Sequence, residues 1–76
     1  MIHKTKYFFI SNSFTSPYKE TVEELKQFII EYKKENPDEP CLVYKMETFL
    51  VLDKHGNIVY DGQFKIRDYN TEDEVI

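Results

Sequence analysis

The pattern of hydrophobic and polar positions divides the chain into one strand, one helix and a longer extended region. Aromatic and β-branched residues dominate residues 4–10, which predicts a strand with apolar side chains on both faces. Apolar side chains then recur every three or four positions between residues 17 and 35, which predicts an amphipathic helix. The expected apolar stripe of this helix contains Tyr18, Val22, Leu25, Ile29 and Tyr32, and Phe28 widens it.

Residues 15–19, Thr-Ser-Pro-Tyr-Lys, have the composition of a helix N-terminus. The hydroxyl of Ser16 is suited to accept a hydrogen bond from a backbone N–H of the first turn. Pro17 would occupy the first helical position, where its missing N–H costs nothing. We therefore predict that Ser16 is the N-cap of a helix over residues 17–35, and that Pro37 prevents its continuation.

The second half of the chain reads as extended structure interrupted by turns. Residues 41–53 contain neither Gly nor Pro, so they form either one long bent strand or two strands broken near Met46-Glu47. Asp53-Lys-His-Gly-Asn57 predicts a turn in which Gly56 takes a positive φ. Strands are then expected at residues 57–60 and 63–69, joined by a second turn at Asp61-Gly62.

The predicted order is β-α-β-β-β, and the fold class is α+β. We expect a small, mainly antiparallel sheet of about four strands with one helix packed on one face. Residues 1–69 are predicted to form a single domain, because 76 residues are too few for two. Residues 70–76 are predicted to form an acidic C-terminal tail, most simply a solvated one.

Composition narrows the class of protein. The net charge is −4, and Cys41 is the only cysteine, so the chain cannot form an internal disulfide and suits a reducing compartment. The longest fully apolar run has four residues, which predicts no membrane span, and the single cysteine predicts a cytoplasmic location. The sequence has no Ala and one Arg against nine Lys, which is typical of AT-rich genomes such as those of small bacteriophages.

Two stretches resemble the thioredoxin-like family. TFLVLDKHGNIVYDG, residues 48–62, is similar to the final hairpin of that family, and TSPYK is similar to its strand–CPYC–helix junction. The two stretches cover about twenty residues, a quarter of the chain. Ser16 and Lys19 stand where that family has its two cysteines, and no Pro precedes the Thr48–Asp53 strand, where it keeps a cis-proline. Without a thiolate and a resolving partner, the resemblance does not imply redox chemistry.

Few residues could carry catalysis or metal binding. His3 and His55 have neither helical nor C-x-x-C spacing relative to Cys41 or to one another, so we expect no metal site. A single Cys on a strand is most often a small buried hydrophobe, although a dyad of Cys41 with His3 or His55 is a second interpretation. We predict that the protein is not an enzyme, with no catalytic residue and no cofactor.

The six tyrosines point to an interface, because Tyr supplies contact area together with a polar tip. We predict a non-catalytic cytoplasmic protein that binds another protein, as phage modulators or inhibitors of host proteins do, either as a homodimer or in a partner-bound form. The alternative is a nucleic-acid-binding protein that uses Lys45, Lys65 and Arg67 beside exposed aromatic rings. The candidate interaction residues are Tyr44, Phe64, Tyr69, Glu72, Asp73, Glu74 and Ile76.

Overall fold

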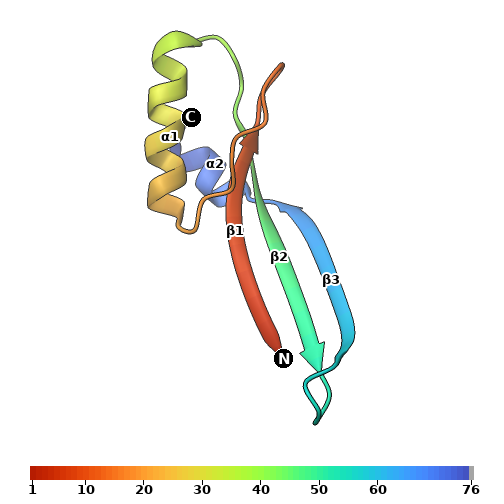
Figure 1. Ribbon diagram of the computed structural model, residues 1–76. Coiled ribbons are helices and arrows are strands. Elements are labelled where there is room, and N and C mark those ends of the chain that lie inside the picture. The colour runs from red at the N-terminus through yellow and green to blue at the C-terminus, as the bar shows by residue number, and fades with distance from the viewer. Residues whose placement is uncertain (76) are drawn as a thin grey trace.

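The computed structural model describes residues 1–75 and has an α+β fold (Figure 1). Three strands form one antiparallel sheet in the order β1-β2-β3, and two helices lie at one end of it. The elements follow one another as β1 (Ile2–Ile10), α1 (Val22–Glu35), β2 (Leu42–Leu52), β3 (Ile58–Arg67) and α2 (Tyr69–Val75). The predicted class is therefore confirmed, while the predicted four strands and single helix are replaced by three strands and two helices.

A small core forms where α1 packs across one face of the sheet, which we call the helix face. Leu25 and Ile29 of α1 are fully buried against Phe9 of β1 and Val43 of β2. The aromatic rings of Phe14, Phe28 and Tyr32 lie around Phe9, with centroids 5.2–5.8 Å from its ring. The helical stripe predicted from the sequence therefore supplies the core from Leu25 onward.

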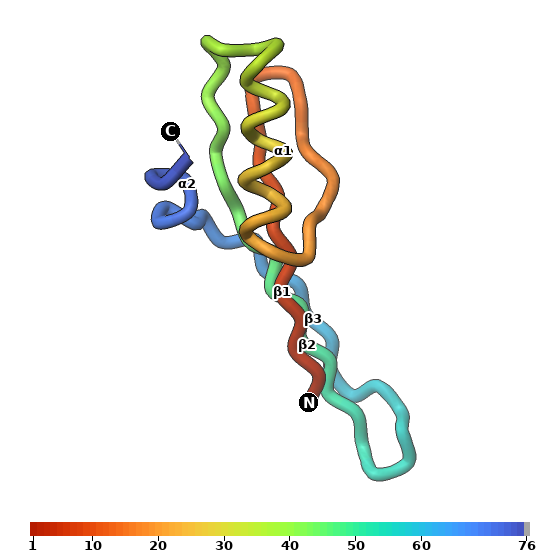
Figure 2. The backbone as a smooth tube through the Cα atoms, turned by 90° about the vertical axis from the view of Figure 1, so that its left-hand side faces the viewer, coloured from red at the N-terminus to blue at the C-terminus, as the bar shows by residue number. Residues whose placement is uncertain are grey.

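The sheet is longer than the helix that covers it. The molecule measures 51 × 22 × 18 Å and has a radius of gyration of 15.1 Å, whereas a compact chain of this length has about 11 Å. Residues 2–6 and 47–64 form a three-stranded extension that projects beyond both helices, as Figure 2 shows. We call this extension the arm. Its side chains line two sheet faces that no other element of residues 1–75 covers.

The prediction that Ser16 caps the helix is wrong. The N-cap is Thr21, whose side chain accepts a hydrogen bond from the N–H of Glu24. Residues 15–19 run extended along the edge of β1, where Tyr7 and Lys19 exchange both backbone hydrogen bonds. Ser16 is buried in this segment, and its Oγ accepts a bond from the N–H of Phe9. Pairing with the sheet edge therefore overrides the local preference for a helix start.

Replacing Ser16 with Ala should lower the free energy of unfolding by about 1–2 kcal/mol, because the Ser16 Oγ bond to the Phe9 N–H would be lost in a buried place. Urea denaturation followed by circular dichroism measures the change. Ser13→Ala is the matched control, since Ser13 lies exposed in the same loop and should change stability very little. Equal stability of the two variants would contradict this role for Ser16.

The predicted turn at Asp61-Gly62 is also wrong. Both residues lie inside β3, where they pair with Leu50 and Phe49 of β2. The space above Gly62 is filled by the Tyr60 side chain, whose hydroxyl would lie 2.7 Å from a Cβ at that position. A glycine in a strand can thus mark close packing by a neighbouring ring. By contrast, the turn at 53–57 is confirmed, with Gly56 at φ 82°, and residues 42–52 form one unbroken strand.

The residues predicted as a tail form helix α2 up to Val75, while Ile76 lies outside the described residues. Asp68 precedes the helix, and its carboxylate accepts from the backbone N–H and the hydroxyl of Thr71. Val75 packs against the core, and Glu74 forms an ion pair with Lys26 of α1. The acidic segment is thus part of the packed structure.

Candidate interaction surface

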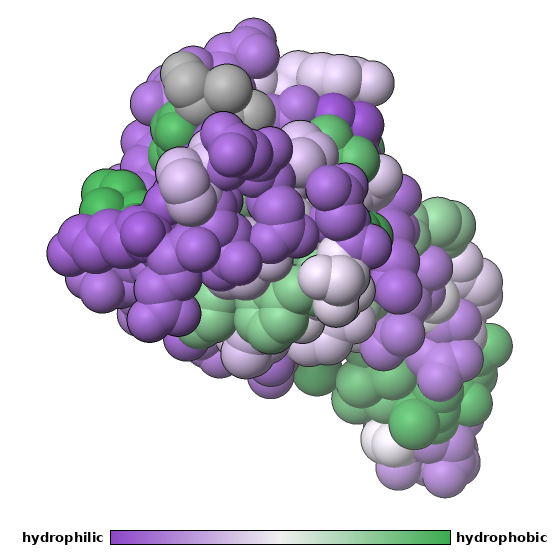
Figure 3. Space-filling model, turned by 90° about the horizontal axis from the view of Figure 1, so that it is seen from above, coloured by the Kyte–Doolittle hydropathy of each residue, from purple (hydrophilic) through white to green (hydrophobic). Residues whose placement is uncertain are grey.

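The face of the sheet opposite α1, which we call the open face, exposes apolar side chains on the arm. Antiparallel register places Ile2 beside Leu50, and Leu52 beside Ile58 in the next row. Ile2, Leu52 and Ile58 expose 45%, 40% and 62% of their surface. Figure 3 shows hydrophobic atoms gathered at the far, narrow end of the molecule. We call the four residues the arm patch.

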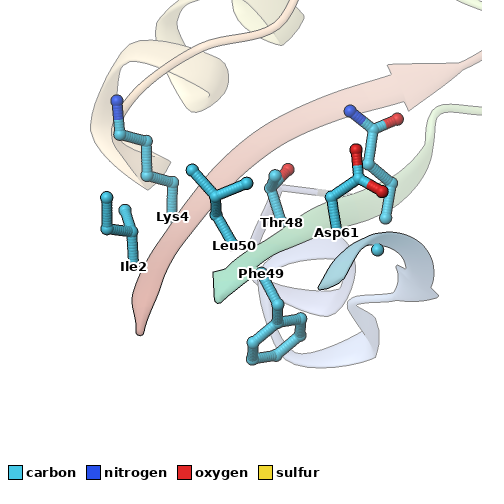
Figure 4. A pocket seen from close by; sticks show the side chains of 8 residues that line it. Ile2, Lys4, Thr48, Phe49, Leu50 and Asp61 are labelled. Carbon is cyan, nitrogen blue, oxygen red and sulfur yellow. The ribbon is translucent and has the colours of Figure 1, made fainter. Parts of the chain in front are cut away.

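A shallow groove of about 550 Å³ runs across the same part of the arm. Figure 4 shows Ile2, Leu50 and Thr48 standing on one side of the strands, with Lys4 and Asp61 at its ends and Phe49 pointing to the other side. An apolar floor between an amine and a carboxylate suits a partner segment with one or two apolar side chains between groups of opposite charge.

The helix face of the arm carries a second, more polar group. The ring of His3 stacks on Phe49 with a centroid separation of 4.5 Å, and Phe49 meets Phe64 edge to face. His3 and Thr5 both bond to the carboxylate of Glu47, and chiefly the bond from His3 lowers the pKa of Glu47. These contacts stiffen the arm where no helix supports it.

The strongest electrostatic cluster joins β3, α2 and β2. Two guanidinium nitrogens of Arg67 donate to the carboxylate of Glu72, with Nε–Oε2 2.7 Å and Nη2–Oε1 2.6 Å. Oε2 of Glu72 also accepts the N–H of Val43 at 2.9 Å, so Glu72 occupies the place beside β2 where β3 no longer continues. The bond from Arg67 lowers the pKa of Glu72, and the same pairing raises that of Arg67.

The predicted interaction residues do not form one surface. The ring centres of Tyr44 and Tyr69 lie 5.6 and 4.9 Å from the central guanidinium carbon of Arg67, whereas Phe64 lies on the helix face. Glu72 is buried and held by Arg67. Of the remaining candidates, Asp73 is exposed, Glu74 binds Lys26, and Ile76 is not described.

The basic residues of the nucleic-acid alternative are divided between the two faces of the sheet. Lys45 pairs with Ile66 on the helix face, while Lys65 and Arg67 lie on the open face. The Lys65 ammonium lies 5.7 Å from the centre of the Phe8 ring, and Arg67 is bound by Glu72. Of these three residues, only Lys65 and Arg67 share a face, and the charge of Arg67 is neutralised by Glu72.

Cys41 and the histidines are far apart. Cys41 is fully buried in the core, and burial raises the pKa of its thiol. His3 lies opposite Phe49, eight positions along β2, and His55 lies in the exposed turn beyond the end of that strand. At about 3.3 Å per residue, this separation rules out direct contact of the imidazoles with the thiol.

Comparison with known proteins gives no relative: neither a family model, nor a curated protein, nor a solved structure matches this chain. Within residues 1–75, no three His, Cys, Asp or Glu side chains gather where they could hold a metal ion. None of the described helices has both the length and the apolar character needed to cross a bilayer.

The arm patch was not anticipated from the sequence. None of its four residues is among the interaction candidates predicted from the sequence. One signal did point to them: residues 49–52 are apolar at every position, so one helix cannot cover both of their faces.

Proposed function

We propose that the protein is a small non-catalytic binding protein that contacts another protein through the open face of its arm. The observation that carries this proposal is the arm patch, in which Ile2, Leu52 and Ile58 remain exposed, and of which Ile2 and Leu50 also line the groove. Isolated apolar side chains are common on surfaces, but a contiguous group on a projecting element is typical of an interface. The lone buried Cys41 suits action in a reducing cytoplasm, as for a phage-type modulator of a host protein.

A protein partner is favoured over nucleic acid because of the chemistry at the groove. Its floor is apolar, and its ends carry one positive and one negative group, Lys4 and Asp61. Nucleic acid would require several cations along one track. The cations nearest to exposed rings, Lys65 and Arg67, are instead drawn over aromatic rings or bound to Glu72.

The double variant Ile2→Asp/Ile58→Asp should lose its partner while keeping its fold, since both side chains are exposed and lie on the patch. The tagged protein would be used for affinity capture from a lysate of its host cell, with captured proteins identified by mass spectrometry. Ile30→Asp is the matched control, because Ile30 is 51% exposed on α1, far from the arm.

A partner captured by the wild type and by Ile30→Asp, but not by the double variant, would support the proposal. A partner retained equally by all three would contradict it. Capture of nucleic acid, with affinity that falls steeply as salt rises, would favour the alternative function.

A further inference from the structure

The outer edge of β3 has backbone groups directed to solvent in a regular order. Val43 of β2 bonds away from β1, because its N–H reaches Glu72 and its C=O accepts from Asp68. Successive residues of a strand direct their N–H and C=O groups to opposite neighbours, so Lys45, two positions after Val43, also bonds toward β3. Its partner Ile66 bonds back toward β2, and the residues at odd positions of β3 bond outward. The residues of β3 whose N–H and C=O then point outward are Asp61, Gln63 and Lys65.

The side chains of β3 alternate in character along the same stretch. Tyr60, Phe64 and Ile66 lie on the helix face and are about half exposed. The three outward-bonding residues place a carboxylate, an amide and an ammonium on the open face, at two-residue intervals. An edge strand with one apolar and one charged side is suited to pair with a strand of matching pattern.

Two copies of β3 are complementary when they pair antiparallel with Gln63 of one copy opposite Gln63 of the other. In that antiparallel register Asp61 faces Lys65 of the second copy, and Lys65 faces Asp61 of the second copy. Gln63 faces its own counterpart, and Tyr60 faces Ile66 on the other side of the sheet. In this register each outward-bonding residue of one copy lies opposite an outward-bonding residue of the other. The N–H and C=O groups of the two strands can therefore bond to one another.

Neighbouring registers with the correct backbone direction lose this match. Reversal about Gly62 sets Asp61 against Gln63 and leaves Lys65 opposite Val59. Reversal about Phe64 sets Asp61 against Arg67, whose guanidinium is already bound by Glu72. Charge complementarity therefore selects the register centred on Gln63.

The other edge of the sheet does not offer the same match. Along β1, the outward N–H groups of Tyr7 and Phe9 are bonded by residues of the segment 15–19. The remaining stretch of β1 carries Lys4 and Lys6. If a second copy paired antiparallel with this stretch about Thr5, Lys4 of each copy would face Lys6 of the other. Lysines on an edge strand protect it against pairing.

We propose that a second copy of the chain pairs antiparallel along β3, with a two-fold axis at Gln63, to form a continuous sheet of six strands. The occupant of this edge is the chain itself, because the strand is complementary in charge, in apolar pattern and in backbone direction to its own reverse. Ile2 and Ile58 lie outside the paired stretch, so the dimer leaves the arm patch accessible. Asp61, at one end of the groove, would face Lys65 of the second copy in the dimer. The dimer is inferred from β3 alone and does not depend on the proposed function.

Charge reversal tests the register. Asp61→Lys and Lys65→Asp, each alone, would place two like-charged pairs across the axis and should weaken self-association by about tenfold or more. Mixing the two single variants restores two opposite-charged pairs, so they should form a heterodimer with near wild-type affinity. Sedimentation velocity over a range of protein concentrations measures each association, and circular dichroism checks that each variant is folded.

Amide hydrogen exchange provides a second measurement on the unmodified chain. The N–H groups of Gln63 and Lys65 should exchange slowly at concentrations where the protein is dimeric, and rapidly after dilution. A wild-type chain that remains monomeric at several hundred micromolar would overturn the proposal. A dimer that persists unchanged in both single variants, or open-ended assemblies larger than a dimer, would also overturn it.

Discussion

Glu72→Ala should lower the free energy of unfolding by about 2–3 kcal/mol, or the melting temperature by roughly 10–20 °C. Truncation leaves the Val43 N–H without its acceptor and Arg67 without its carboxylate. Both groups then lose charge-assisted hydrogen bonds that water replaces only in part. Thermal unfolding followed by circular dichroism measures the effect. Asp73→Ala, an exposed neighbour on the same helix, is the control and should change little.

The pH dependence separates the charge of Glu72 from its hydrogen-bonding geometry. Because Arg67 holds the pKa of Glu72 below its ordinary value of 4.5, the ionised form stabilises the fold fully above that value. This contribution is lost as pH falls from about 5 through the lowered pKa. Glu72→Gln keeps an acceptor for Val43 but has no charge, so its stability should fall less steeply in acid. The lowered pKa of Glu47 affects the wild type and Glu72→Gln equally. If the stability of the two proteins fell with pH in the same way, the ion pair of Glu72 with Arg67 would be contradicted.

Phe9→Ala should destabilise the fold more than any other single truncation of a core side chain, by about 3–5 kcal/mol. The Phe9 ring is fully buried, and the rings of Phe14, Phe28 and Tyr32 surround it. Its removal leaves a cavity between β1 and α1 that these rings cannot fill without leaving their preferred positions. Urea denaturation measures the loss, and a chain this small could be partly unfolded without denaturant.

Phe64→Ala is the matched control for that experiment. Phe64 is 48% exposed and touches only the edge of Phe49 among the aromatic rings of the described chain. In dilute solution, where self-association does not contribute, the loss should be well below that of Phe9→Ala. Equal losses would mean that the core is not centred on Phe9.

The sequence was informative where a local pattern and the tertiary contacts agree. The 53–57 turn requires a residue with positive φ, and Gly56 provides it. The stripe from Leu25 to Tyr32 has helical spacing, and the same residues pack on the sheet. Prediction succeeded here because no long-range contact competes with the local preference.

Prediction from the sequence failed where pairing with another strand decides the local conformation. Ser16-Pro17 has the composition of a helix start, but the edge of β1 offers residues 15–19 a set of backbone hydrogen bonds, and Thr21 is an equally good cap. Asp61-Gly62 has the composition of a hairpin turn, but β2 continues past it and holds it extended. Asp61 and Gly62 lie 11 and 13 positions from their partners Leu50 and Phe49, and Ser16 lies seven positions from Phe9, so in both places strand pairing overrides the composition of the turn or helix start.

The C-terminal helix could have been recognised from one signal. Asp68 is followed three positions later by Thr71, a spacing suited to an N-cap, and Glu72 falls in the first turn. Acidic composition was interpreted instead as solvation. The arm patch is a different case, because whether apolar strand residues are covered depends on the length of α1 relative to the sheet, which is a property of the assembled fold.

The bond between Val43 and Glu72 also sets an order of events during synthesis. The two residues are 29 positions apart, and translation at about 5–20 residues per second separates their appearance by roughly 1.5–6 s. Throughout that interval β2 has one edge without its capping carboxylate, and β3 is complete only when Arg67, five residues before Glu72, has been added. We therefore expect the sheet to remain incomplete on the nascent chain until α2, which carries Glu72, has emerged from the ribosome and packed beside β2.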